Sequence, residues 1–197
     1  GKLLNLSYGY GKVFVVSFEK IGNQVQGGVF ELPVPRFSTG VMRGRFNPGD
    51  GQLYLCGLSA WGSTQPQLGG LYRIRKVDQP MVIPVGIKAT KQGIELTFTD
   101  ELDSKSVSDT ANYAVRIWDL LRSRKYGSKH LNEQTLKVTQ AQLAQDKKTV
   151  ILSIPEIKPT WGMEIKYKLK DKEGFNREGL VQNTIHQLGG SSKVGTQ

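Results

Sequence analysis

Four residues with chemically useful side chains surround one strand-like segment of the chain. Arg43, Arg45 and Asp50 precede residues 52–58, whose sequence QLYLCGL alternates as a β-strand does, and Trp61 follows this segment. Guanidinium groups bind carboxylates, and an indole ring offers a large flat surface for stacking. We therefore predict that these four residues bind a sugar or a carboxylate. The alternative is an Arg–Asp pair that braces a loop, with the indole covering the end of a sheet.

Other residues that could do chemistry are few. Asp100, Glu101 and Asp103 form the densest carboxylate cluster, which could bind calcium or transfer protons, but Asp-rich turns between strands are commoner. The only histidines are His130, expected in an exposed loop, and His186, expected at a strand end. Two histidines cannot build a three-histidine metal site. We expect no catalytic residue, metal ligand or cofactor in this chain.

One cysteine and two further tryptophans complete the inventory. Cys56 lies inside the apolar strand pattern, which predicts a buried and inert thiol rather than a nucleophile. A c-type haem is attached through two cysteines, so this chain cannot carry one. Trp118 and Trp161 are predicted to fill cores, and stacking on a sugar is the alternative for each.

Bulk composition is that of a folded, soluble domain. The 197 residues are 38% hydrophobic and 22% charged, with a formal charge of +10. The basic excess is spread out, with 9 basic against 4 acidic residues up to residue 80 and 18 against 13 after it. A nucleic-acid partner would rest on charge alone and is not expected. No apolar run is long enough for a membrane span, and no signal-peptide pattern opens the chain, which begins in a strand-like segment as a fragment would.

The first part of the chain predicts short antiparallel strands without a helix. Strand patterns cover residues 3–8, 12–19, 25–32, 52–58 and 70–75, and turns rich in glycine, proline and asparagine separate them. Val13–Phe18 is apolar at nearly every position, so we expect this strand to be buried on both faces. The pattern is that of a meander resembling a propeller blade, and residues 1–78 are assigned to it.

The second part predicts an immunoglobulin-like β-sandwich. Prolines bracket a connection at residues 78–84, and the strand patterns that follow give residues 81–190 as a second domain and 191–197 as a flexible tail. Ile94, Leu96 and Phe98 alternate with Glu95 and Thr97, which predicts one buried and one solvated face. A single helical turn is expected after Asp103 or Ser104, and residues 120–133 are expected to form an exposed basic loop. The fold class is therefore all-β.

Several segments resemble the C-terminal region of large secreted bacterial proteins. These segments are VMRGRFNPGDGQLYLCGL, GGLYRIR, PVGIKATKQGIELTFTDELD, NYAVRIWDL, IKYKLKDKEGF and NTIHQLG, and together they cover nearly the whole chain. The proteins in question carry a β-propeller like that of glucose/sorbosone dehydrogenases, often beside cytochrome c-type haem modules.

This resemblance implies a non-catalytic structural or binding region at the end of a sugar-dehydrogenase-like protein. Residues 1–78 would be the last blade or two of its propeller, and residues 81–190 its appended immunoglobulin-like domain. The implied partners are the upstream propeller and haem domains, and carbohydrate. Haem c or a quinone would belong to the parent oxidoreductase, not to this chain, and the location would be secreted or periplasmic. A free-standing carbohydrate-binding module is the alternative function.

Overall fold

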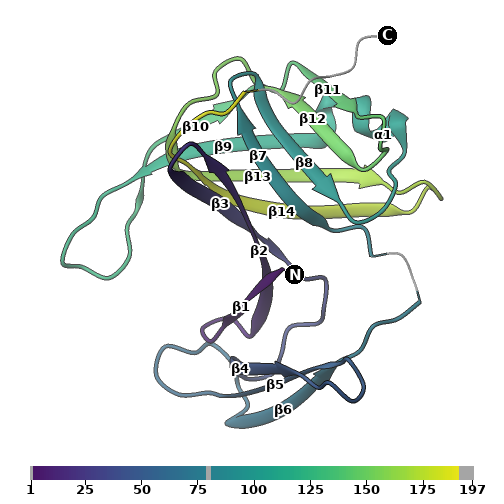
Figure 1. The fold of residues 1–197 in the computed structure, drawn as a ribbon. Helices are drawn as coiled ribbons and strands as arrows, with labels where there is room; N and C mark the ends of the chain where they lie inside the picture. The colour runs from purple at the N-terminus through teal and green to yellow at the C-terminus, as the bar shows by residue number, and fades with distance from the viewer. Residues whose placement is uncertain (1, 79–80, 191–197) are drawn as a thin grey trace. The chain divides into compact units, whose positions relative to one another are not determined.

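The computed structural model describes residues 2–78 and 81–190, and its ribbon is drawn in Figure 1. Strands dominate, and all the strand pairings with an assigned register are antiparallel. The all-β prediction of a meander and a sandwich is confirmed. The predicted tail at 191–197 lies outside the described residues.

The described chain divides into two compact units. One takes its residues from Gly1–Val15 and Glu31–Met81, and the other from Val16–Phe30 and Val82–Gln197. The second unit therefore includes residues from the early part of the chain, in the hairpin of β2 (Lys12–Ile21) and β3 (Gln24–Glu31). The domain boundary inferred from the prolines at 78–84 stays a prediction.

The first unit is built on a three-stranded antiparallel sheet of β4 (Gly40–Phe46), β5 (Leu53–Leu58) and β6 (Gly69–Ile74), in the order β4-β5-β6 (Figure 1). β1 (Leu3–Ser7) lies beside the first part of β2. The inner face of the sheet packs into a small core of Val13, Val41, Leu53 and Leu55, bordered by Leu4, Leu6, Leu32, Phe37, Tyr72 and Ile74.

The second unit is a sandwich of two sheets. One sheet has the order β11-β12-β8-β7, from β7 (Pro84–Thr90), β8 (Gly93–Phe98), β11 (Gln140–Leu143) and β12 (Thr149–Ser153). The other has the order β2-β3-β14-β13-β9-β10, in which β2 takes part with its residues from Val16 on. Its later strands are β9 (Tyr113–Leu120), β10 (His130–Leu136), β13 (Thr160–Lys170) and β14 (Asn176–Ile185). Their inner faces share the core, where Phe98 meets Tyr167 edge-on at 5.4 Å between ring centroids. Burial raises the pKa of the Tyr167 phenol to about 12.

The helical turn expected after Asp103 is confirmed as α1 (Ser104–Ser108), followed by the 3-10 turn η1 (Thr110–Asn112). Asp103 is the N-cap, and its carboxylate accepts a hydrogen bond from the Ser106 N–H at 2.7 Å. Within the cluster of Asp100, Glu101 and Asp103, the Asp103 carboxylate therefore caps a helical turn. Within the described ranges, no helix is long and apolar enough to cross a membrane.

Two predictions about which faces of β2 and β8 are buried are wrong. Phe18 is 68% exposed, so β2 is not buried on both faces; Val13, Val15 and Ser17 form its buried side. Glu95 is only 6% exposed, although it was expected on a solvated face. β8 is an inner strand between β12 and β7, and Lys88 on β7 holds its Nζ 4.0 Å from the Glu95 carboxylate.

Candidate functional site

The outer face of β4, β5 and β6 carries two of the predicted binding residues. Strand register places Arg45 opposite Tyr54 and Tyr54 opposite Arg73, which forms one row across all three strands. Because side chains at i and i+2 share a face of a strand, the next row holds Arg43, Cys56 and Leu71, and Leu58 lies beyond it. We call this surface the arginine face; it consists of Arg43, Arg45, Tyr54, Cys56, Leu58, Leu71 and Arg73.

The guanidinium groups of the arginine face have no carboxylate partner within 4.0 Å in the described part of the chain. Arg43 donates to the carbonyl of Met42, and Arg45 donates to the carbonyl of Gly44 at 2.8 Å. These bonds to neighbouring carbonyls leave most of each guanidinium fork open to solvent. Leu71, between the arginine rows, is 76% exposed. The surface is therefore cationic and partly apolar.

Asp50 belongs to the turn that precedes β5. Its carboxylate accepts hydrogen bonds from the Gln52 N–H at 2.9 Å and from the Tyr54 hydroxyl at 2.8 Å. The Gln52 N–H, then the Tyr54 hydroxyl and the charge of Arg73, hold the pKa of Asp50 below its usual range. Asp50 thus lies beside the row formed by Arg45, Tyr54 and Arg73, where it orients the tyrosine. It forms no direct pair with Arg43 or Arg45.

Trp61 is separated from the other predicted binding residues. Asp50 comes three residues before β5 and Trp61 three residues after it, so they lie beyond opposite ends of this strand. The indole is 90% exposed. Its loop is held by Tyr8, whose hydroxyl donates to the Trp61 carbonyl and accepts from the Ala60 N–H, both at 3.0 Å. The structure therefore places Arg43 and Arg45 on β4 and Asp50 in the turn between β4 and β5, whereas Trp61 lies beyond the other end of β5.

Cys56 is exposed, and the prediction of a buried thiol is wrong. Residues Leu53 and Leu55 of β5 point into the core, and Cys56 alternates to the arginine face. The sequence QLYLCGL is apolar on both faces, so alternation alone does not show which face is covered.

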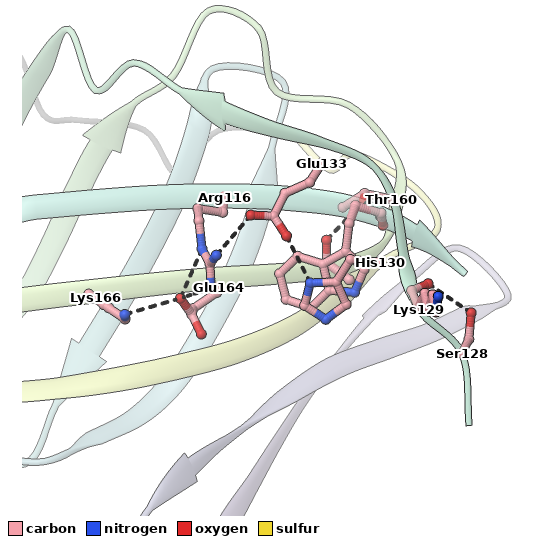
Figure 2. Close-up of polar contacts among 10 residues, drawn as sticks. Arg116, Ser128, Lys129, His130, Glu133, Thr160, Glu164 and Lys166 are labelled. Atoms are coloured by element: carbon pink, nitrogen blue, oxygen red, sulfur yellow. Dashed lines mark hydrogen bonds and ion pairs between the residues drawn. The ribbon is translucent and has the colours of Figure 1, made fainter. Parts of the chain in front are cut away.

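A second cluster of charged and aromatic side chains lies on the outer face of β9, β10 and β13 in the sandwich (Figure 2). The rings of Trp118 and His130 are stacked, with centroids 4.0 Å apart and an interplanar angle of 14°. His130 is the first residue of β10 and is exposed, as predicted, and its Nδ1 lies 2.8 Å from the Glu133 carboxylate. Trp118 is buried, but it lies beneath His130 on this outer face and not between the two sheets.

Arg116 links the carboxylates of this cluster. It contacts Glu164 through two nitrogens, at 3.1 and 2.7 Å, and Glu133 through a third at 2.8 Å, and Lys166 lies 3.6 Å from Glu164 (Figure 2). The bond to His130, then the charge of Arg116, lower the pKa of Glu133, and the bond to Glu164 raises that of Arg116. Each charge has an opposite partner, so this network positions β10 on β9 and offers no free reactive group.

The close approach of Gly162 to Trp118 yields a prediction. A Cβ at position 162 would lie 2.2 Å from Cε2 of the indole, so Gly162→Ala forces the rigid ring to move. We expect a loss of about 2 kcal/mol in unfolding free energy, typical of an overpacked site. The His130 ring protons should lose the ring-current shift caused by Trp118, which NMR measures. Gly190→Ala, whose Cβ meets nothing within 4 Å, is the control. Unchanged His130 shifts in Gly162→Ala would contradict the packing described.

Trp161 was predicted to fill a core, but 42% of it is exposed. The pairing of β13 with β14 is irregular between Thr160 and Met163, and such a bulge turns a side chain away from the regular alternation. The Arg122 guanidinium lies 4.8 Å from the centroid of the indole, and the His186 ring meets it edge-on at 5.3 Å. The sequence signal for the contact between Arg122 and Trp161 is limited to the basic composition of residues 120–133. The bulge that exposes Trp161 depends on strand register, which the local sequence does not show.

Comparison with known proteins gave no match: no protein-family model, no curated protein and no solved structure is significantly similar to this chain. Among the residues that the structure describes, no group of three or more histidine, cysteine, aspartate or glutamate side chains lies close enough to hold a metal ion.

Proposed function

We propose that this chain is a non-catalytic structural and binding region at the C-terminal end of a larger secreted or periplasmic protein that resembles sugar dehydrogenases. The observation that supports the proposal most directly is the arginine face. One face of the three-stranded meander is covered by the unit's own core, and the other leaves Leu58 and Leu71 exposed. Exposed leucines on a sheet face are typical of a sheet that lacks a neighbouring domain.

The missing neighbour on this proposal is the upstream propeller. Propeller blades are sheets arranged around a common axis, so an end blade is incomplete without the next one. The arginine face adds a chemical requirement, because burying three cations needs acidic or carbonyl groups opposite them. The neighbouring surface is therefore expected to be acidic around an apolar centre. Haem or quinone chemistry, if the parent protein has it, would belong to that upstream part.

Charge reversal on the arginine face tests this proposal. We expect the upstream region, produced separately, to bind this chain, and Arg45→Glu/Arg73→Glu to weaken the dissociation constant about tenfold or more, because like charges then oppose one another. Isothermal titration calorimetry measures both. Lys105→Glu/Lys137→Glu makes the same change of charge on exposed residues of the sandwich and should leave the affinity unaltered.

Two results would overturn the proposal. One is equal affinity of the charge-reversed and unaltered chains, or no association with the upstream region. The other is sugar oxidation by this chain alone when an electron acceptor, or a quinone with calcium, is supplied.

A second candidate function is that of a carbohydrate-binding module. The observation that favours it is the display of tryptophan side chains: Trp61 is held outward on a loop that Tyr8 anchors, and Trp161 is held outward by a bulge. Quenching of tryptophan fluorescence by oligosaccharides would support this function, and a flat titration across neutral and acidic sugars would remove it.

A further inference from the structure

The connection between β9 and β10 is a long, wholly exposed loop with a strong positive charge. Every residue from 119 to 135 is exposed, and residues 121–129, which we call the basic arm, hold four cationic and no anionic side chains: Arg122, Arg124, Lys125 and Lys129. Figure 1 shows this loop running out from the ends of the two strands. None of the four cations forms an ion pair within 4.0 Å in the described ranges.

The base of the basic arm is ordered by hydrogen bonds. The Ser128 hydroxyl accepts from the Leu121 N–H at 2.9 Å. It donates to the Lys129 carbonyl, also at 2.9 Å (Figure 2). The stacking of His130 on Trp118 fixes the start of β10 at the same place. Asn132, in the left-handed conformation with a φ of 49°, donates to the Asp119 carboxylate and joins the two strands. The cations are therefore carried on an anchored hairpin.

The basic arm meets a flat aromatic surface at its base. Arg122 lies over the ring of Trp161, and this contact between a guanidinium and an indole is a cation–π pair. Two hydroxyl groups hold the bulge that presents the indole: Thr160 donates to the carbonyls of Trp118 and Gly162, and Thr184 donates to the carbonyl of Trp161 at 2.8 Å. The partly exposed indole and the Arg122 guanidinium thus lie together, and the other three cations of the basic arm follow Arg122 within seven residues of the chain.

We propose that the basic arm and Trp161 form a binding site for an acidic polysaccharide, a chain of sugars that carry carboxylates. In this site a sugar ring stacks on the exposed part of the Trp161 indole, and Arg122 and Arg124 bind the carboxylates. The inference rests on the second proposed function, carbohydrate binding, and supplies its ligand class and site.

The number of stacking surfaces favours a sugar chain over single-stranded nucleic acid. Proteins that bind single strands stack successive bases on successive aromatic side chains along a basic groove. Here Trp118 is buried under His130, and Tyr126 stands in the exposed arm itself, so Trp161 is the sole partly open indole at the base of the arm. One flat surface with several cations suits a ring that alternates with carboxylates.

The test is a fluorescence titration of the full chain with three oligomers of equal length: hexagalacturonate, its methyl ester and hexathymidylate. We expect hexagalacturonate to quench tryptophan emission with an affinity that falls as salt is raised, and the uncharged ester to bind roughly tenfold more weakly or worse, because it offers no carboxylate to the guanidinium groups. Arg122→Ala/Arg124→Ala should weaken hexagalacturonate binding to a similar extent, and Trp161→Leu should abolish the quenching.

The control variant removes the same charge elsewhere in the unit. Lys105 and Lys137 are exposed and lie beyond the strand ends opposite the arm, near the end of β13 and after β10 respectively, so Lys105→Ala/Lys137→Ala should bind normally. All the substituted residues except Trp161 are exposed, and matching urea unfolding curves will show that the variants fold.

Each unfavourable outcome has its own meaning. Equal weakening by the arm and control variants, or tighter binding of hexathymidylate than of hexagalacturonate, overturns the acidic-polysaccharide site. Binding of the ester as tight as that of hexagalacturonate overturns it too, but leaves carbohydrate binding in place. No binding of either sugar overturns both.

Discussion

Replacing Asp171 by alanine lowers the free energy of unfolding by about 3 kcal/mol, because a buried carboxylate with four hydrogen bonds is removed and its cation is left behind. Asp171 lies in the turn between β13 and β14 and is buried. Its carboxylate accepts from the N–H groups of Glu173 and Phe175 at 3.0 and 2.9 Å, and from Arg177 at 2.9 and 2.7 Å. Urea denaturation at neutral pH measures the loss.

The same residue gives a pH dependence with a defined sign. Burial raises the pKa of Asp171, but the Arg177 bond and the two backbone N–H bonds outweigh burial and hold the pKa below the usual range of an aspartate. A carboxyl whose pKa is lower in the folded state stabilises the fold above its unfolded pKa, and loses that contribution as the pH falls through the folded pKa. The difference in stability between the unaltered chain and Asp171→Ala should therefore be constant near neutrality and shrink below about pH 4.

Asp171→Asn is the matched variant. An amide oxygen can still accept from the two backbone N–H groups, so we expect about half the loss seen with alanine at neutral pH. This loss should also shrink as the pH falls, because the group that titrates is Asp171 of the unaltered chain. Equal losses at pH 7 and pH 3 for Asp171→Ala would show that the effect comes from shape alone and would contradict the electrostatic account.

Gly28→Ala is expected to detach the β2–β3 hairpin from the sandwich. Gly28 pairs with Asn183 on β14, and a Cβ at position 28 would lie 2.2 Å from the carbonyl oxygen of Gln182. The obstacle is backbone, so the two strands must separate. We expect a loss of about 3 kcal/mol, at the upper end for an overpacked site.

Hydrogen exchange locates this effect. Protection should fall at Phe30 and Val181, which face one another across the β3–β14 pair, and should be retained at Ile165 in the middle of β13. Gly190→Ala serves again as the control, since its Cβ meets open space. Protection lost throughout the sandwich would show that the hairpin cannot open separately, and unchanged protection would show that β3 does not pair there.

The sequence allowed prediction of the class of fold and most strands, because alternation of side chains in a strand is a local property. It did not show which face of a strand is covered. Cys56 and Phe18 were expected to be buried and are exposed, whereas Glu95 was expected in water and is buried. In each case the burial of the side chain depends on which strands lie beside the segment, and those strands come from distant parts of the chain.

The candidate sites were predictable to a similar degree. Arg43 and Arg45 lie on β4 and Asp50 lies in the turn that follows it, as their closeness in sequence suggests, and ligand binding by them stays a prediction. Trp61 is close in sequence, yet β5 separates it from the group. Arg122 and Trp161 are 39 residues apart and meet because of a bulge in the pairing of β13 with β14. Such a register shift cannot be predicted from the local sequence.

The pairing of β3 with β14 also determines when the sandwich can be completed during synthesis. Residues 27–30 of β3 pair with residues 181–184 of β14, so two neighbouring strands of the larger sheet come from the early part and from near the end of the described chain. During synthesis, β3 cannot pair with β14 until almost all of the described chain has left the ribosome. Through that interval both β-edges have unpaired backbone groups, so the nascent chain is most prone to aggregate just before its last strand arrives.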